Sequence, residues 1–171
     1  MKKLLMVSML AAVLAAGTAY ADHPEGIGIG VEFGGFTAWN GWGFGVNTLL
    51  SLKFPDLPVF WAVGADINFQ NNSGFAFMIT GDYYLLDGPI VGDLLHWYMG
   101  AGLQLNLGFG VNTFTFGISA RIPVGLSLQF PVSKLVLEVY FQVVPTIGTF
   151  IVPFKFPAGG IGGSFGFRVW L

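Results

Sequence analysis

The sequence has no cysteine, few charged residues and only one long apolar run. The missing cysteine excludes disulfide bonds and a lipid-modified cysteine at the N-terminus. Charged residues make up 9% of the chain, whereas a soluble domain carries them on about 25–35% of its surface. After the first residues, Gly, Pro, Asn or a charge interrupts every apolar stretch, so membrane-spanning helices are excluded. Such a chain is held together by burial or by a membrane.

The one long apolar run lies at the start and has the three zones of an export signal. Lys2 and Lys3 precede an apolar stretch over residues 4–16, and Ala19-Tyr20-Ala21 gives the small-residue pattern of a cleavage site. The stretch is too short to span a membrane as a helix. We therefore expect residues 1–21 to be a cleaved signal peptide.

The processed chain, residues 22–171, is long enough for one domain. Loss of the two leading lysines leaves five basic and nine acidic residues, a net charge of about −4. A negative net charge argues against a protein that binds nucleic acid or anionic lipid through bulk positive charge. We therefore expect no nucleic-acid partner.

Alternation with a period of two recurs along the whole processed chain. It is clearest over residues 59–70, where apolar side chains occupy one face and Asp66, Asn68 and Gln70 lie on the other. Eight segments follow the pattern: residues 26–35, 42–54, 59–70, 75–86, 96–107, 113–130, 135–148 and 160–171. The sequence predicts an all-β fold, a closed eight-stranded antiparallel up-and-down transmembrane β-barrel with its apolar face in lipid.

The connectors between these segments are mostly clusters of Gly, Pro, Asn and Asp of hairpin length. An even strand count returns the chain to the end where it began, so we expect both termini in the periplasm. Pro123 and Pro145 fall inside otherwise regular strands. Because proline cannot donate to a ladder, we predict a kink or bulge there, with shorter sixth and seventh strands.

Three features together resemble a known class of proteins: the leader, the alternating strands and the ending Phe165-Gly-Phe167-Arg-Val169-Trp-Leu171. This ending is similar to the C-terminal signal of outer-membrane barrels, although Leu171 stands where an aromatic residue is usual. The segment Arg121-Ile-Pro123-Val-Gly125-Leu126, with Leu137-Glu138 and Pro145, resembles small spirochaetal barrels of the OmpA, OmpX and OmpW-like superfamily. The resemblance implies the cell outer membrane as location, with its lipid and the barrel-assembly machinery as partners. Members serve as membrane anchors, adhesins, narrow passages or lipid enzymes.

The predicted inward face carries a polar set that eight strands would pack into a filled lumen. We expect a lumen network of Glu32, Asn47, Lys53, Asp66, Asp82, Gln104, Arg121, Glu138 and Arg168. Symmetric turns put Asp82, Gly100 and Arg121 at one level, where the missing side chain of Gly100 would let the other two meet. A structural ion pair is the favoured interpretation, with a gate or solute contact as the alternative.

The same construction puts Asn47 opposite Asp66, with Glu32 near Gly45 on the adjoining strand. Two nearby carboxylates can bind a cation or share a proton. The alternative is that Asn47, Asn68 and water satisfy them, and we favour it. We therefore predict no metal site. The glycine runs lack the following helix and Lys of a phosphate-binding loop, so no cofactor is expected either.

Neither histidine suggests catalysis. His23 belongs to a flexible start, and His96 begins a strand beside Trp97 and Tyr98, where interfacial packing is expected. No inward His-x-Ser pattern accompanies them, so we expect no catalytic residues and no enzyme.

Aromatic residues gather near the strand ends, as in the two girdles of membrane barrels. The predicted girdle residues are Trp39, Trp42, Phe54, Phe69, Tyr83, Trp97, Phe130 and Trp170.

The favoured function is a non-enzymatic integral membrane protein with a structural role and a filled lumen. The alternative is a narrow, porin-like channel or transporter of the OmpW-like kind for small or apolar solutes, with Phe150, Phe154 and Phe156 in an apolar entrance loop. For that loop itself, the favoured interpretation is an extension of the two strands beside it.

Overall fold

The computed structural model describes residues 23–24, 26–38, 44–68, 74–110 and 113–171. Nine strands make up these ranges: β1 (Gly28–Ala38), β2 (Phe44–Lys53), β3 (Phe60–Asn68), β4 (Gly74–Val91), β5 (Leu95–Gly110), β6 (Thr113–Arg121), β7 (Val124–Val132), β8 (Leu135–Val152) and β9 (Lys155–Trp170). The described part of the chain contains no helix long and apolar enough to cross a membrane. The predicted signal peptide, residues 1–21, lies outside the described residues.

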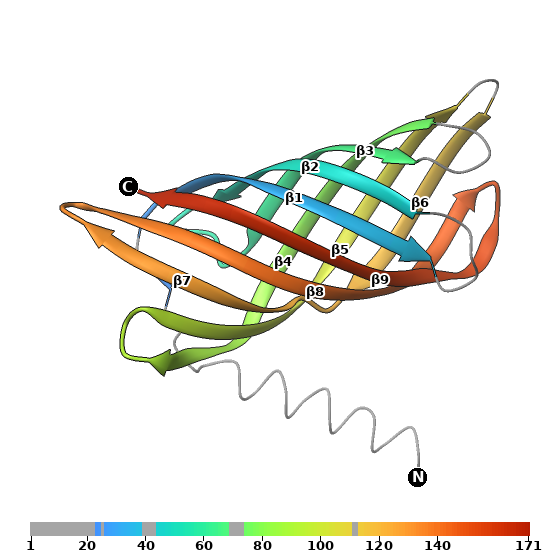
Figure 1. Cartoon of the computed structure of the whole chain (residues 1–171). Coiled ribbons are helices and arrows are strands. Elements are labelled where there is room, and N and C mark those ends of the chain that lie inside the picture. The colour runs from blue at the N-terminus through green and yellow to red at the C-terminus, as the bar shows by residue number, and fades with distance from the viewer. Residues whose placement is uncertain (1–22, 25, 39–43, 69–73, 111–112) are drawn as a thin grey trace, which may run out of the picture.

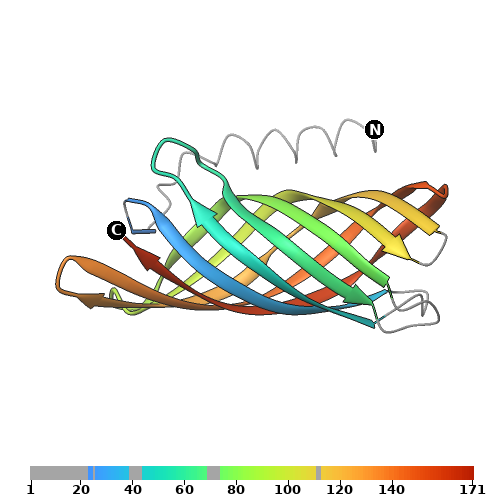
Figure 2. The same ribbon diagram turned by 90° about the horizontal axis from the view of Figure 1, so that it is seen from above.

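All neighbouring strands are antiparallel, and their pairing closes into a ring (Figures 1 and 2). β1 pairs with both β2 and β9, so the first and last strands join. β6 and β7 both lie between β5 and β8 and together fill one place in the ring. The predicted ring of eight antiparallel strands is therefore confirmed. We call the end that holds the start of β1 and the finish of β9 the terminal end, and the opposite end the far end.

The shared place of β6 and β7 is interrupted at Ile122 and Pro123. Arg121 and Val124 keep the same register on both neighbouring strands, so no residue is inserted and no bulge forms. The ladder breaks because proline has no N–H to donate, although the Ile122 N–H still donates to the Pro145 carbonyl at 3.0 Å. A kink or bulge was predicted at both prolines, and the structure instead shows an interrupted ladder without a bulge at Pro123. The predicted shortening of the strands was wrong, because β8 continues through Pro145 without a break.

Two hairpins are longer than the alternating segments. β4 and β5 continue to a short turn after Val91, although residues 87–95 were expected to form a connector. Register shifts at Tyr84/Leu86 and Pro89/Val91 mark two irregularities in β4. At the far end, β8 and β9 extend to a turn between Val152 and Lys155, which confirms the interpretation of this loop as an extension of the two strands.

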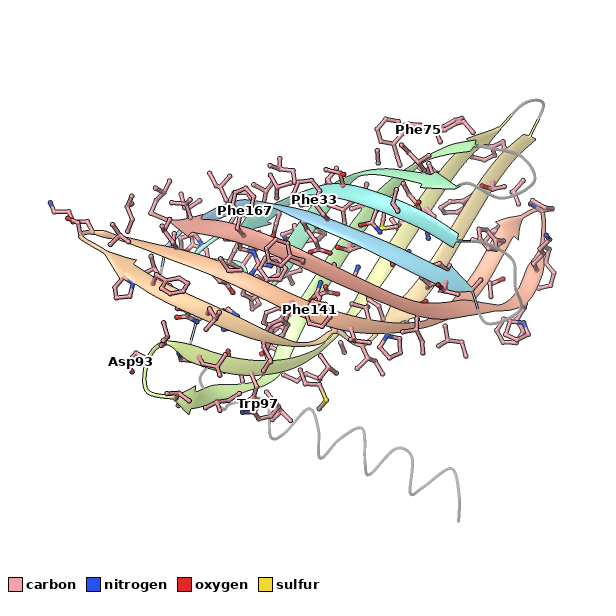
Figure 3. All side chains as sticks on the ribbon, viewed as in Figure 1. Phe33, Phe75, Asp93, Trp97, Phe141 and Phe167 are labelled. Carbon is pink, nitrogen blue, oxygen red and sulfur yellow. The ribbon has the colours of Figure 1, made fainter. Side chains whose placement is uncertain are left out.

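The two faces of the ring differ as the alternation predicted. Outward positions carry exposed apolar side chains, including Phe33, Phe141 and Phe167, which project away from the strands in Figure 3. Inward positions hold a buried cluster made of Phe60, Tyr84, Tyr98, Tyr140 and Trp170 and a smaller one made of Leu49, Ala62 and Met78. The lumen is therefore the core of the protein, and the outer surface is apolar.

Candidate functional site

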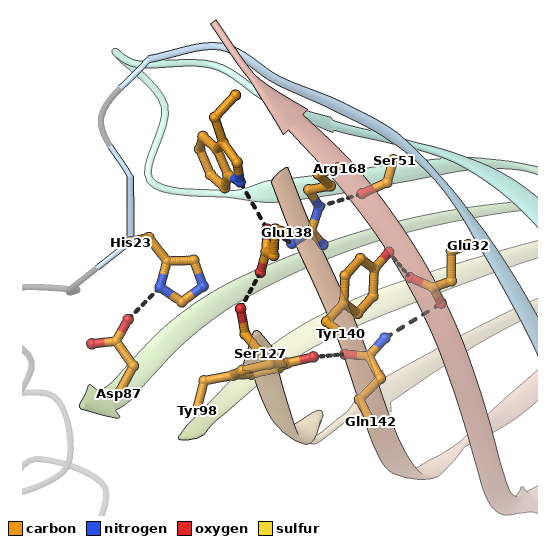
Figure 4. A network of polar contacts seen from close by, with 11 residues as sticks. His23, Glu32, Ser51, Asp87, Tyr98, Ser127, Glu138, Tyr140, Gln142 and Arg168 are labelled. Atoms are coloured by element: carbon orange, nitrogen blue, oxygen red, sulfur yellow. Dashed lines mark hydrogen bonds and ion pairs between the residues drawn. The ribbon is translucent and has the colours of Figure 1, made fainter. Parts of the chain in front are cut away.

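The most connected residue of the lumen is Glu138 on β8, whose side chain is fully buried. Its carboxylate accepts hydrogen bonds from Ser127 Oγ at 2.8 Å, Trp170 Nε1 at 2.9 Å and Arg168 Nη1 at 3.1 Å (Figure 4). Arg168 also donates from Nε to Ser51 Oγ at 2.7 Å. The three donors to Glu138 lie on β7 and β9, and Ser51, which accepts from Arg168, lies on β2, so one buried ion pair links β8 to β2, β7 and β9.

Aromatic rings surround the Arg168 guanidinium. Its central carbon lies 4.1 Å from the ring centroid of Tyr140 and 4.9 Å from that of Phe60. Phe60 stacks on Tyr84 at 4.1 Å between centroids, and Tyr84 stacks on Tyr98 at 4.4 Å. Cation–π contact adds to the ion pair in holding a buried guanidinium. This aromatic stack fills the lumen toward the terminal end.

A second carboxylate, Glu32 on β1, is held by neutral donors. It accepts from Tyr140 Oη at 2.9 Å and from Gln142 Nε2 at 3.3 Å. Tyr98 Oη donates to the amide oxygen of Gln142 at 3.1 Å, which extends the network across the lumen. The expected position of Glu32 near Gly45 is wrong, because the β1–β2 register pairs Glu32 with Leu49.

Asp82 and Arg121 meet across β5, with Arg121 Nε 3.0 Å from Asp82 Oδ1 and both side chains buried. The glycine between them is Gly102, and the expectation of Gly100 is wrong. A Cβ on Gly102 would lie 2.0 Å from Asp82 Oδ1, so only glycine leaves room for this carboxylate. The error came from the turn of the β4–β5 hairpin, which lies later in the chain than the sequence indicated. Because the offset is two residues, the face was still correct.

Asn47 on β2 pairs with Asp66 on β3, and the predicted position of Asn47 opposite Asp66 is therefore confirmed. The other two residues of the expected lumen network lie apart from the ion pairs. Gln104 donates from Nε2 to Asn106 Oδ1 at 3.2 Å on its own strand. Lys53 is half-buried at the end of β2, where Nζ donates to the Phe54 carbonyl at 2.8 Å.

Both histidines differ from expectation. His23 is not part of a free start: its side chain is 5% exposed, it pairs with Asp87, and its ring edge packs against Phe60 and Tyr84. His96 is not interfacial, because it is 3% exposed on the inward face opposite Ser127. Ser127 is fully buried and donates to Glu138, an arrangement that shields the hydroxyl from water and substrate.

The predicted girdle residues divide into three groups. Phe54, Tyr83, Trp97 and Phe130 are exposed near the terminal end. Trp39, Trp42 and Phe69 lie outside the described residues. Trp170 was wrongly placed: it is 2% exposed in the lumen, and its indole N–H binds Glu138. Its position follows from alternation, since it lies two residues after the inward Arg168.

The proposed entrance loop is a hairpin tip. Phe154 is 77% exposed and Phe156 is 69% exposed, whereas Phe150 is half-buried where β8 passes Gly117 of β6. Phe154 and Phe156 therefore add exposed apolar surface at the far end.

Hollow space in the described part of the barrel is limited. A cavity of about 30 Å³ lies in mid-lumen, with Glu32, Asn47, Gln104, Arg121, Thr146 and Ser164 in its wall. A larger hollow of about 760 Å³ opens at the terminal end beside His23, Lys53, Pro55, Asp56, Phe60 and Tyr84. The small cavity has room for about two waters, and the aromatic stack separates the mid-lumen from the terminal end.

Comparison with known proteins gives a structural match. No protein-family model matches the chain, and no curated protein matches its sequence. The crystal structure of Neisserial surface protein A (NspA) aligns with a TM-score of 0.55 over 85% of this chain and 96% of NspA, at 16% identity. The chain has the NspA fold. At this identity the likeness concerns the fold alone, and the resemblance to spirochaetal members of the OmpA, OmpX and OmpW-like superfamily stays a prediction.

Proposed function

We propose that the protein is a non-enzymatic integral outer-membrane barrel whose role is structural. The observation that carries the proposal is the inverted distribution of side chains. Large apolar residues are exposed around the whole ring, while two arginines and three carboxylates are buried inside it. A soluble barrel would place these groups the other way round. In lipid, the closed ring leaves no strand edge without hydrogen bonds.

The filled lumen supports a role without transport. Phe60, Tyr84 and Tyr98 stack across the terminal half, and Arg168 packs against them. The mid-lumen cavity of about 30 Å³ is too small for a solute larger than a few water molecules. We therefore expect no steady ion conductance.

An even number of places in the ring puts both ends of the barrel domain at the terminal end, which supports a periplasmic terminal end as in bacterial outer-membrane barrels. The expected export signal would deliver the chain to this compartment, and outer-membrane lipid is then the main partner. The C-terminal strand β9 carries the ending that resembles the signal read by the barrel-assembly machinery.

The OmpW-like channel is the second candidate function. The observation that favours it is the exposure of Phe154 and Phe156, which form an apolar surface at the far end. An apolar solute would contact this surface first and then pass Phe150. Solute uptake that is lost when Phe154 and Phe156 are both replaced by Ser would support this function over the structural one.

Tryptophan quenching tests the membrane assignment directly. In single-tryptophan variants reconstituted in lipid with brominated chains, Trp61 and Trp97 should be quenched because they are exposed on the outer face. Trp170 is the matched control and should keep its emission, because it is buried in the lumen. Equal quenching of all three, or a compact monomer in buffer without detergent, would contradict a lipid-facing barrel.

Planar-bilayer recordings separate the two candidate functions. The refolded protein should show heat-dependent gel mobility, as closed barrels do, and no steady single-channel current. Regular currents from a preparation with the expected gel mobility would exclude a purely structural role while leaving the barrel assignment intact.

A further inference from the structure

Three buried oxygen atoms on neighbouring strands have no hydrogen-bond partner among the described residues: Ser164 Oγ on β9, Asn47 Oδ1 on β2 and Asp66 Oδ1 on β3. They follow one row of the ladder, because Gly34 of β1 pairs with Ser164 on one side and with Asn47 on the other, and Asn47 pairs with Asp66. Buried polar atoms are rarely left unpaired. Three in one row therefore indicate that a water molecule or an ion completes their contacts.

Gly34 lets two of these side chains, Asn47 and Ser164, pack closely over its backbone. A Cβ at this position would lie 2.7 Å from Asn47 Oδ1 and 3.1 Å from Ser164 Cβ. The mid-lumen cavity of about 30 Å³ lies here, with Ser164, Asn47 and Glu32 in its wall. Ser164 is 7% exposed, so its hydroxyl faces the cavity and not bulk solvent.

The charges of the lumen are unbalanced at the same place. Glu138 pairs with Arg168, and Asp82 pairs with Arg121. Of the inward carboxylates in the described ranges, Glu32 has only neutral donors and Asp66 Oδ1 has none. Both lie on strands next to β2, one on each side of Asn47. An excess of buried negative charge is costly unless a positive charge offsets it.

We propose that a small monovalent cation, Na⁺ or K⁺, binds at the edge of this cavity between Ser164 and Asn47, with the carboxylates of Glu32 and Asp66 supplying negative charge. Hydroxyl, amide and carboxylate oxygens are the hard donors that such ions prefer. The described residues contain no group of three or more His, Cys, Asp or Glu placed to hold a metal ion, which disfavours a transition-metal site. Arg121 lines the opposite wall and would keep the ion on the Asn47 side.

Thermal unfolding of the full refolded chain tests the site. Unfolding is followed by gel mobility in NaCl, KCl or N-methyl-D-glucamine chloride at one pH and one ionic strength. The unfolding temperature should rise saturably with Na⁺ or K⁺ by several degrees over the organic cation. Ser164→Ala should remove most of this rise, whereas Ser119→Ala, a serine of β6 outside the cavity wall, should keep it.

Asp66→Asn gives a second signature. Because it removes uncompensated charge, this variant should unfold at a higher temperature than wild type in the organic cation and should no longer respond to Na⁺. Crystals soaked in Rb⁺ or Tl⁺ should show anomalous density beside Asn47 and Ser164. If Asp66→Asn fails to fold, the wild-type titration and the crystal soak still decide.

Two outcomes would overturn the proposal. Equal unfolding temperatures in all three salts, with no anomalous density, would show that water fills the row. A response to pH without any response to Na⁺ or K⁺ would show that protons, and not a metal cation, neutralise the carboxylates. Neither outcome affects the membrane assignment, which depends on the outer face.

Discussion

Removing either partner of the Glu138–Arg168 pair should strongly destabilise the barrel. Glu138 is fully buried and accepts three hydrogen bonds, and Arg168 is 3% exposed. Glu138→Gln keeps the volume but leaves a buried guanidinium without its counter-charge, and Arg168→Met leaves a buried carboxylate. Each variant should lose about 3–5 kcal/mol of unfolding free energy, the usual cost of breaking a buried pair.

The double variant tests the reasoning more sharply than either single change. Glu138→Gln combined with Arg168→Met leaves no unpaired charge at this place, so its loss should fall short of the sum of the single losses by about 2–3 kcal/mol. Unfolding by guanidinium in lipid vesicles, followed by tryptophan emission, measures the four free energies. Asp93→Asn, in the exposed β4–β5 turn, is the control and should change the free energy by less than about 0.5 kcal/mol. Additive losses would show that the two side chains are independent and would refute the pairing argument.

Two further changes test the lumen and the outer face. Gly102→Ala should lower the unfolding free energy by about 2–3 kcal/mol, because its Cβ would clash with Asp82 Oδ1. Gly163→Ala is the control and should change the unfolding free energy little, because its Cβ would have no neighbour nearer than 3.9 Å. Equal losses in the two variants would contradict the clash. Phe141→Arg, in the middle of an outward strand face, should cost about 2–4 kcal/mol in vesicles, and Phe154→Arg at the hairpin tip about 0–1 kcal/mol. Equal losses at these two positions would argue against a bilayer around β8.

The faces of the strands were predictable because a period of two is a strong local signal. Alternation alone separated the outward residues, such as Phe141, from the inward ones, such as Glu138, along every strand. The same rule pointed inward for Trp170 and His96, which share the parity of inward neighbours. We instead expected the aromatic Trp170 at a rim and His96 at an interface because of their residue types, and both expectations were wrong. Parity was the better guide.

Register and long-range contacts were harder to predict. The partner glycine of Asp82 depends on where the β4–β5 turn lies and on two irregularities after Tyr84, and local sequence does not specify either. The burial of His23 has no local signal at all, because it precedes the alternating segments and its partner Asp87 is 64 residues away. Such contacts arise from the closed geometry of the barrel.

The contact between His23 and Asp87 also has a mechanical consequence. His23 leads into β1, whereas Asp87 belongs to β4, so the contact spans the mouth between walls separated by β2 and β3. Such a brace resists flattening of the circular cross-section, the distortion that uneven lateral pressure from surrounding lipids would impose. This single contact thus couples two walls of the mouth that share no hydrogen bonds of the ladder.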